Sequence, residues 1–212
     1  MRVATAARRV GLDDIDALVK QGIVKAYPRN AVIVNEGDDT DAFYLIISGR
    51  VKVYLSDDEG REIVLTTQEA GDYFGEMVLD GGPRSASVMT LEPSRLAVLP
   101  KRNFRAFLES HPTFSSHLVE RLIGRVRELT GNVKSLALMD VYGRVARLLL
   151  DLAVEENGRW VINEKLTQQD IADRVGSSRE MISRIFKDLS AGGYMRIDKR
   201  RITLLRQPPR HW

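Results

Sequence analysis

Two groups of residues carry side chains suited to binding charged partners. In the first group, Gly75, Glu76, Arg84 and Ser85 lie close together in the sequence. Glycine lets a ligand approach the backbone closely, and an arginine guanidinium can pair with a phosphate through two hydrogen bonds. Serine adds a hydroxyl and a backbone N–H, while glutamate can accept a hydrogen bond from a sugar hydroxyl. The group is chemically suited to a small anionic ligand, but from the residue types alone a surface ion pair between Glu76 and Arg84 is the commoner outcome.

The second group lies near the C-terminus and consists of Arg179, Glu180 and Arg184. Arginine can donate two hydrogen bonds to guanine, and glutamate can accept one from the amino group of cytosine. Arg184 follows Glu180 by four residues, so on a helix it shares a face with the glutamate and can reach a base or hold the glutamate in place. These residue types predict contacts with the bases of double-stranded DNA.

Two short helices would position the second group. Thr167 with Asp170 forms a capping-box pattern, which marks a helix start, and Ser177 with Glu180 forms a second one. Gly176 supplies the left-handed residue between the two helices. The apolar residues at helical spacing, which would form the inner faces, are Ile171, Ala172, Val175, Ile182, Ile185, Phe186 and Leu189. Two such helices form a helix-turn-helix, in which the N-terminal end of the second helix enters the major groove.

A β-hairpin is predicted after these helices. Its strands are residues 194–197 and 201–205, joined by Asp198-Lys199-Arg200. The hairpin would be the wing of a winged helix, and Lys187 and the Lys199-Arg200-Arg201 cluster are suited to phosphate contacts. The competing interpretation is an ordinary helical hairpin with a polar outer face. Two capping boxes, the glycine turn and the basic leading end of the second helix disfavour it.

The first hundred residues have the pattern of an antiparallel β-structure. Short apolar runs separated by Gly- and Asp-rich turns predict strands at residues 42–47, 50–55, 62–68, 85–91 and 95–100. No long amphipathic helix separates these runs, which disfavours a Rossmann-type alternation. The spacing predicts a sandwich, a roll or a barrel.

Helical spacing begins after these strands. One short helix is predicted over residues 101–110 and a long one from residue 113 onward. The long helix carries apolar residues that alternate in steps of three and four: Val119, Leu122, Val126, Leu129, Val133 and Leu136. This narrow stripe predicts pairing with a second copy of the helix, and packing against the chain's own domain is the alternative. A third helix over residues 141–154 would start at Asp140 as its N-cap.

Composition and charge restrict the function classes further. A chain of 212 residues that is 43% hydrophobic and 29% charged predicts packed domains, and no run reaches the roughly 18 to 20 apolar residues of a membrane span. The N-terminal residues 1–18 lack the apolar run of a secretory signal. The absence of cysteine excludes disulfides, thiolate metal sites and iron–sulfur clusters, and the scattered His111, His117 and His211 disfavour a metal site. Residues 140–212 carry 14 Lys/Arg against 10 Asp/Glu, which favours a polyanionic partner.

The order of these elements resembles the Crp/Fnr family of bacterial transcription regulators over nearly the whole chain. Phe74-Gly75-Glu76-Met77 followed by Pro83-Arg84-Ser85-Ala86 is similar to the phosphate-binding cassette of cyclic-nucleotide domains, and Ser178-Arg179-Glu180 through Arg184 is similar to the family's recognition helix. The resemblance implies an α+β chain with a β-roll effector domain (residues 1–112), a dimerisation helix and hinge (113–139) and a winged helix-turn-helix (140–212).

The resemblance also implies roles for individual residues. The implied effector contacts are Gly75, Glu76, Met77, Arg84, Ser85, Arg125 and Thr130, with Thr130 meeting the base across the dimer and Arg125 supporting the pocket. The implied DNA contacts are Thr167, Gln168, Ser178, Arg179, Glu180, Ser183, Arg184, Lys187, Lys199 and Arg200. The expected partners are a palindromic DNA site, a second copy of the chain and RNA polymerase, in the cytoplasm and away from membranes. No catalytic residue and no covalent cofactor are expected.

Cyclic AMP is the effector that the resemblance favours, bound as an allosteric ligand. Two departures from the family pattern bear on that choice: the stretch between Glu76 and Arg84 is short, and Leu129 stands where cyclic-AMP-responsive members carry a hydroxyl residue. A regulator that senses another small molecule, or none, is therefore the alternative. An enzyme using Glu76 and Arg84 is disfavoured because no histidine, cysteine or second carboxylate accompanies them, and a module that regulates a partner protein would need no basic recognition helix.

Overall fold

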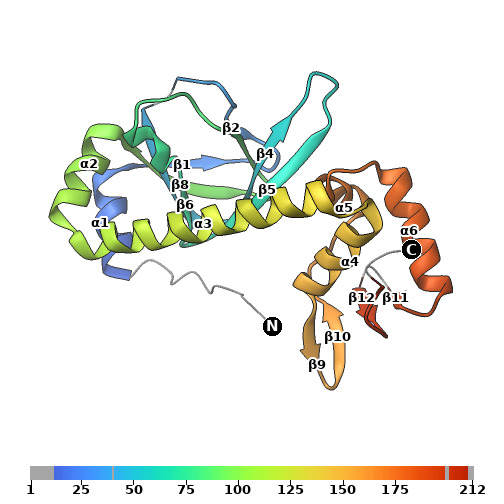
Figure 1. Cartoon of the computed structure of the whole chain (residues 1–212). Coiled ribbons are helices and arrows are strands. Elements are labelled where there is room, and N and C mark those ends of the chain that lie inside the picture. The colour runs from blue at the N-terminus through green and yellow to red at the C-terminus, as the bar shows by residue number, and fades with distance from the viewer. Residues whose placement is uncertain (1–11, 40, 199–200, 210–212) are drawn as a thin grey trace. The chain divides into compact units, whose positions relative to one another are not determined.

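The computed structural model describes residues 12–39, 41–198 and 201–209. The chain divides into two compact units, one of Met1–Ser56 and Val64–Glu128 and the other of Asp57–Ile63 and Leu129–Trp212. Helix α3 (Pro112–Leu138) begins in the first unit and ends in the second (Figure 1). In the part of the chain that the structure describes, no helix has the length and apolarity needed to span a membrane.

The first unit contains a roll of two four-stranded sheets. Its strands are β1 (Ile23–Tyr27), β2 (Val32–Val34), β3 (Ala42–Ser48), β4 (Arg50–Ser56), β5 (Glu62–Glu69), β6 (Tyr73–Phe74), β7 (Ser87–Thr90) and β8 (Ser94–Pro100). The sheets have the orders β1-β8-β3-β6 and β2-β7-β4-β5, and the pairings of β3 with β8 and of β4 with β7 are antiparallel. The β-roll and its five predicted strands are confirmed. Strands β1, β2 and β6 were not predicted because they are short or lack apolar alternation.

Helices pack on the roll through aromatic side chains. They are α1 (Leu12–Gln21), α2 (Lys101–Ser110) and the start of α3, and a short 3₁₀ helix, η1 (Glu76–Leu79), follows β6. Phe43 of β3 stacks on Phe104 of α2, with their ring centroids 3.8 Å apart, and Phe107 meets Phe114 of α3 edge-on at 5.2 Å. Burial of these rings removes large apolar areas from water and fixes α2 and the first turns of α3 on the sheet.

Strand β1 lies at the edge of its sheet and pairs only with β8 among the described strands. Its apolar side chains are largely in solvent, with Ile23 67% and Val24 40% exposed, and the exposed Lys25 lies beside them at the centre of the strand.

The six apolar residues at the three-four spacing of α3, here called the α3 stripe, are all exposed. They are Val119 at 55%, Leu122 at 38%, Val126 at 63%, Leu129 at 38%, Val133 at 66% and Leu136 at 48%. The residues of α3 that enter the core of the roll are Phe114 and Leu118, which precede the stripe. Packing of the stripe into the chain's own core, the alternative left open by the sequence, is therefore excluded.

The second unit combines three helices with a four-stranded sheet. Its elements are α4 (Val141–Leu152), β9 (Val154–Glu156), β10 (Arg159–Ile162), α5 (Gln168–Val175), α6 (Arg179–Ala191), β11 (Met195–Asp198) and β12 (Arg201–Leu204). The sheet order is β11-β12-β10-β9, so the predicted wing is confirmed as the pair β11 and β12. Asp140 caps α4 as predicted, because its Oδ1 accepts a hydrogen bond from the backbone N–H of Gly143 at 2.7 Å.

The prediction that α4 continues to residue 154 is wrong. The helix ends at Leu152, and β9 and β10 form a hairpin that Figure 1 shows below α4. Asn157 and Gly158 have φ angles of 51° and 74° at its tip. An Asn-Gly pair with two positive φ angles forms the tight turn that matches the twist of paired strands, which is why the chain turns back here.

Candidate anion site and nucleic-acid interface

Gly75 allows the two ends of the cassette (residues 74–86) to come together. It follows β6 with φ +83°, in the left-handed region, and forms the N-cap of η1. A Cβ atom at this position would lie 2.7 Å from Nη1 of Arg84 and 2.9 Å from the carbonyl oxygen of Ala42. Both distances are shorter than atoms in contact allow, so only glycine fits between this carbonyl and this guanidinium.

Arg84 is buried, with 9% of its surface exposed. Its Nη2 donates a hydrogen bond to the carbonyl oxygen of Ala42 at 2.5 Å, and its guanidinium lies over the ring of Tyr44, 5.8 Å from the ring centroid. Its Nε is buried without a hydrogen-bond partner among the described residues. Burial lowers the pKa of the Arg84 guanidinium, whereas the nearby Tyr44 and Glu76 oppose this shift. A buried cation with an unused donor is suited to an incoming anion.

The other cassette residues lie around this guanidinium. Glu76 is half-buried at the start of η1, and within the described chain it forms no ion pair with Arg84, contrary to the simplest interpretation of the sequence. Ser85 is exposed, and its hydroxyl donates to Sδ of the exposed Met77 at 3.2 Å. The structure therefore brings Gly75, Glu76, Met77, Arg84 and Ser85 together, with Glu76 close to the guanidinium and not paired with it.

Two further predicted effector residues lie on α3. Arg125 forms an ion pair with Glu128 of the same helix, with 3.6 Å between Nη1 and Oε2, and its side chain is 27% exposed. Thr130 is exposed and lies in the part of α3 that belongs to the second unit.

The first helix of the helix-turn-helix has the predicted ends. The hydroxyl of Thr167 accepts from the backbone N–H of Asp170 at 3.1 Å, and the Asp170 carboxylate accepts from the N–H of Thr167 at 2.7 Å. Gln168 is the first residue of α5, and Gly176 ends the helix with φ 64°. The reciprocal pair fixes where α5 begins, and the glycine allows the chain to reverse into α6.

The cap of the second helix differs from the prediction by one residue. Ser178, and not Ser177, is the N-cap of α6, since its hydroxyl accepts from the backbone N–H of Met181 at 3.2 Å. The N–H of Ser177 is already used to close α5, where it donates to the carbonyl of Ala172 at 3.0 Å. Glu180 consequently lies one position earlier in its helix. Its own backbone N–H and the Ser178 hydroxyl lower the pKa of its carboxyl group.

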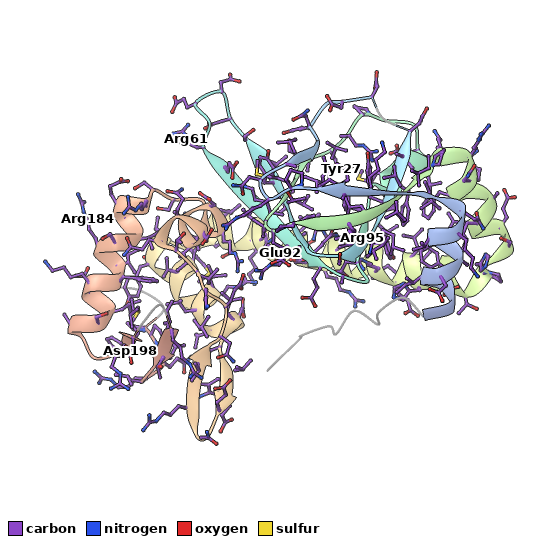
Figure 2. The ribbon with its side chains drawn as sticks, turned by 180° about the vertical axis from the view of Figure 1, so that it is seen from behind. Tyr27, Arg61, Glu92, Arg95, Arg184 and Asp198 are labelled. Atoms are coloured by element: carbon purple, nitrogen blue, oxygen red, sulfur yellow. The ribbon has the colours of Figure 1, made fainter. Side chains whose placement is uncertain are left out.

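The outer face of α6 has the polar residues that the sequence predicted. All six predicted polar residues are exposed, namely Ser178, Arg179, Glu180, Ser183, Arg184 and Lys187, whereas Ile182, Ile185, Phe186 and Leu189 are buried. Figure 2 shows the Arg184 side chain extending away from α6 into solvent. Thr167 is exposed and Gln168 half-buried at the start of α5. Lys199 and Arg200 lie outside the described residues.

Arg144 of α4 supports the helix-turn-helix and was not predicted. Its guanidinium donates to the carbonyl oxygens of Val175 at 2.7 Å, Gly176 at 3.2 Å and Met139 at 3.0 Å. These carbonyls lie at the end of α5 and at the link before α4, where helix ends leave acceptors unpaired. The sequence offers no signal for this role, because an arginine on an amphipathic helix is ordinarily a solvent-exposed residue.

Replacing Arg144 with methionine should destabilise the second unit. The variant keeps most of the aliphatic stem but leaves three backbone carbonyls without their charged donor, which we expect to cost about 2 kcal/mol. Urea denaturation followed by circular dichroism measures this change. Arg159→Met, at an exposed position of β10, is the control and should change stability by less than about 0.5 kcal/mol. Equal stability of the two variants would contradict the supporting role.

Comparison with known proteins matches one family model to each of the two regions that hold these residues. The model of the cyclic nucleotide-binding domain matches residues 24–111, and that of the Crp-like helix-turn-helix domain matches residues 143–208. A "CRP-like cAMP-activated global transcriptional regulator" of Mycobacterium tuberculosis is 34% identical over 195 residues, which cover 90% of this chain and 87% of that protein. The chain belongs to the Crp/Fnr family of transcription regulators. It is thus a DNA-binding regulator with a cyclic-nucleotide-binding domain, and not an enzyme.

Other members of the Crp/Fnr family are similar over most of their length. The "cAMP-activated global transcriptional regulator CRP" of Pasteurella multocida is 33% identical and covers 78% of this chain and 82% of its own. The solved structure of the c-di-GMP responsive global regulator CLP of Xanthomonas campestris has a TM-score of 0.80 at 26% identity, covering 92% of this chain and 99% of that one.

Proposed function

We propose that this Crp/Fnr regulator is a homodimer whose affinity for a palindromic DNA site is controlled by cyclic AMP. The observation that carries the proposal is Arg84, a buried guanidinium that faces Gly75 and keeps a donor free. An anionic phosphate would satisfy that donor and replace part of the water that burial has removed. The two similar regulators described as cAMP-activated support cyclic AMP among such anions.

In the proposed complex, each cassette residue has one task. Arg84 pairs with the cyclic phosphate, Ser85 donates its hydroxyl and backbone N–H to the phosphate, and Glu76 accepts from the ribose hydroxyl. Gly75 leaves room for the phosphate, and Met77 covers the adjoining surface. Thr130 contacts the base from α3, and Arg125 supports the pocket.

The α3 stripe supports the proposal of a homodimer. Its six apolar residues at coiled-coil spacing are all exposed, by 38 to 66%. Two copies of α3 side by side would bury both stripes, as in a two-stranded coiled coil. We also propose the boundaries 1–112, 113–139 and 140–212 for the effector domain, the dimer helix with its hinge, and the DNA-binding domain.

Effector control requires that cyclic AMP bind the dimer conformation that can bind DNA more tightly than the conformation that cannot. A tenfold preference corresponds to about 1.4 kcal/mol, and at saturation each bound effector can raise the DNA affinity by up to the same factor. In the competent state the two α6 helices lie about 34 Å apart, one turn of DNA, so that each reads one half-site. Such a regulator acts on chromosomal DNA in the cytoplasm, where it would meet RNA polymerase.

The experiment that tests this function is selection of bound sequences from a random DNA library, with and without cyclic AMP. We expect a palindromic site and an increase in affinity of at least about tenfold with cyclic AMP, measured by fluorescence anisotropy. Selection of an asymmetric site would contradict the homodimer. A palindromic site whose affinity is unchanged by cyclic AMP would contradict the effector assignment alone.

A regulator with another effector, or with none, is the second candidate. Leu129, where cyclic-AMP-responsive members carry a hydroxyl residue, and the short stretch between Glu76 and Arg84 favour it. The related structure described as c-di-GMP responsive shows that one member answers to a different nucleotide. Calorimetric titration with cyclic AMP and with cyclic di-GMP, followed by the same DNA measurement, distinguishes these cases.

Replacing Arg179 with alanine should weaken binding to the selected site by about 1 to 3 kcal/mol and relax the preference at one base pair. The reason is that a bidentate contact to guanine carries sequence information. Lys187→Ala is the matched comparison on the same helix. Loss of a phosphate contact should weaken binding to all DNA sequences alike, and the slope of log affinity against log salt concentration should fall by about one. An unchanged sequence preference in Arg179→Ala would show that the assigned docking of α6 is wrong.

A further inference from the structure

An ion pair joins α3 to the turn that precedes the cassette. Nη1 of Arg121 lies 3.0 Å from Oδ1 of Asp72, and the side chains are only 18% and 26% exposed. The same guanidinium lies over the ring of Tyr73, with 4.2 Å between Cζ and the ring centroid. Arg121 therefore makes a shielded ion pair and a cation–π contact with two successive residues.

The segment that Arg121 contacts is held on its backbone side as well. The side-chain carboxylate of Asp72 accepts a hydrogen bond from the backbone N–H of Glu69 at 2.9 Å. The backbone carbonyl of Asp72 accepts a second one from the N–H of Ile46 at 2.8 Å. Tyr73 is 1% exposed, and its carbonyl accepts from Nε2 of Gln68 at 3.1 Å. A segment fixed on both sides moves as one body with whatever contacts it.

From this segment the contacts continue directly to Arg84. Phe74 follows Tyr73 and stacks on Tyr44, with the ring centroids 4.8 Å apart, and Tyr44 lies beneath the Arg84 guanidinium. Gly75 comes next, and Nη1 of Arg84 lies so near its backbone that a Cβ atom at this position would be only 2.7 Å away. Two short paths, one through rings and one through the backbone, thus connect Arg121 with the cation of the cassette.

We infer that Arg121 is a positioning residue for the cassette and couples effector occupancy to α3. It acts through Asp72 and Tyr73, and it does not touch the effector. Its place on α3 is between Val119 and Leu122, so a shift of the cassette reaches the helix within the stripe proposed to pair the two copies. The inference rests on the proposed function for its effector and adds the route by which the cassette and the dimer helix influence each other.

The first test needs no effector. In Arg121→Gln, amide hydrogen exchange of the peptide covering residues 73–79 should be about tenfold faster than in the wild type, while strand β8 should be unchanged. Arg127→Gln, at an exposed position of the same helix, is the control and should exchange like the wild type. Equal protection of residues 73–79 in all three proteins would overturn the inference, whichever ligand the protein binds.

The second test measures coupling. The ratio of DNA affinities with and without cyclic AMP should fall about tenfold in Arg121→Gln, and Asp72→Asn should produce the same loss. The two changes together should lose no more than either alone, since both remove one link. Arg121→Lys keeps the ion pair and the fold and should retain part of the ratio. A purely structural role would lower thermal stability and leave the ratio intact, which would also overturn the inference.

Failure of the inference and failure of the proposed function remain distinguishable. Wild-type protein that does not bind cyclic AMP contradicts the effector assignment, and the exchange measurement then still decides on Arg121. Wild-type protein that responds to cyclic AMP while Arg121→Gln responds equally contradicts the coupling role alone.

Discussion

Replacing Arg84 with glutamine should lower the affinity for cyclic AMP by about 3 kcal/mol, or about 150-fold, while the β-roll remains folded. The guanidinium is buried and keeps one donor without a partner, so an anionic phosphate gains a charge-assisted hydrogen bond in surroundings that water does not screen. Glutamine can still donate a hydrogen bond to the Ala42 carbonyl, but it carries no charge for the phosphate.

Isothermal titration calorimetry measures the loss, and circular dichroism checks the fold. Arg102→Gln is the matched control, because it removes one exposed arginine from α2 of the same unit and should change the affinity by less than about twofold. Arg84→Lys should be intermediate, since it keeps the charge and loses the planar fork. If the affinity of Arg84→Gln for cyclic AMP were within about threefold of the wild type, the assigned role of Arg84 in binding the effector would be contradicted.

Replacing Val126 with glutamate should convert the dimer into a monomer and lower the affinity for the palindromic site by about 100-fold or more. Val126 is 63% exposed near the middle of the α3 stripe. In a symmetric pair the same position of both copies meets, so two carboxylates would be buried close to each other without a cation. A monomer then binds one half-site and loses the gain from linked binding of two.

Sedimentation equilibrium gives the oligomeric state, and anisotropy with one and with two half-sites gives the DNA affinity. Arg127→Glu is the control, because it places the same charge on α3 outside the stripe and should leave the dimer intact. If Val126→Glu still sediments as a dimer at micromolar concentration, the α3 stripe does not form the interface.

The helix-turn-helix was predictable because its signals are local. Thr167 and Asp170 are three residues apart, and the reciprocal hydrogen bonds between them form in the structure as the pattern predicts. Gly176 is required by its own φ angle. The missed detail at Ser177 and Ser178 shows the limit of such signals, since either serine hydroxyl can cap a helix. In the structure Ser177 belongs to the turn that closes α5, and the hydroxyl of Ser178 makes the cap of α6.

The hairpin of β9 and β10 was missed although its turn is encoded locally. Asn157-Gly158 is a strong turn signal, but the apolar residues before it continue the helical spacing of α4. The hairpin is stabilised because Trp160 to Ile162 pair along β12 and because Val161 and Ile162 are buried, Ile162 in the core that it shares with α4, α5 and α6. That stabilisation depends on residues forty or more positions away, and no local pattern contains it.

The anion site was predictable in its residues and not in its arrangement. Gly75 and Arg84 are recognisable by type and by family resemblance. The acceptor that Arg84 actually uses is a backbone carbonyl 42 residues away in the sequence. Arg121 and Asp72 are separated by 49 residues, and in the sequence each has the same pattern as a charged residue on a solvent-exposed face. Contacts of this kind follow from the topology of the roll, which brings β3, β6 and α3 together.

The open edge at β1 has a consequence for how copies of this chain can associate. Edge strands with apolar side chains tend to pair with strands of other chains, which can lead to aggregation. Lys25 stands at the centre of β1, so two such edges aligned antiparallel would place two ammonium groups opposite each other. That repulsion opposes growth through the sheet. The proposed association through α3 would instead bury the α3 stripe of both copies, and the assembly would stop at two.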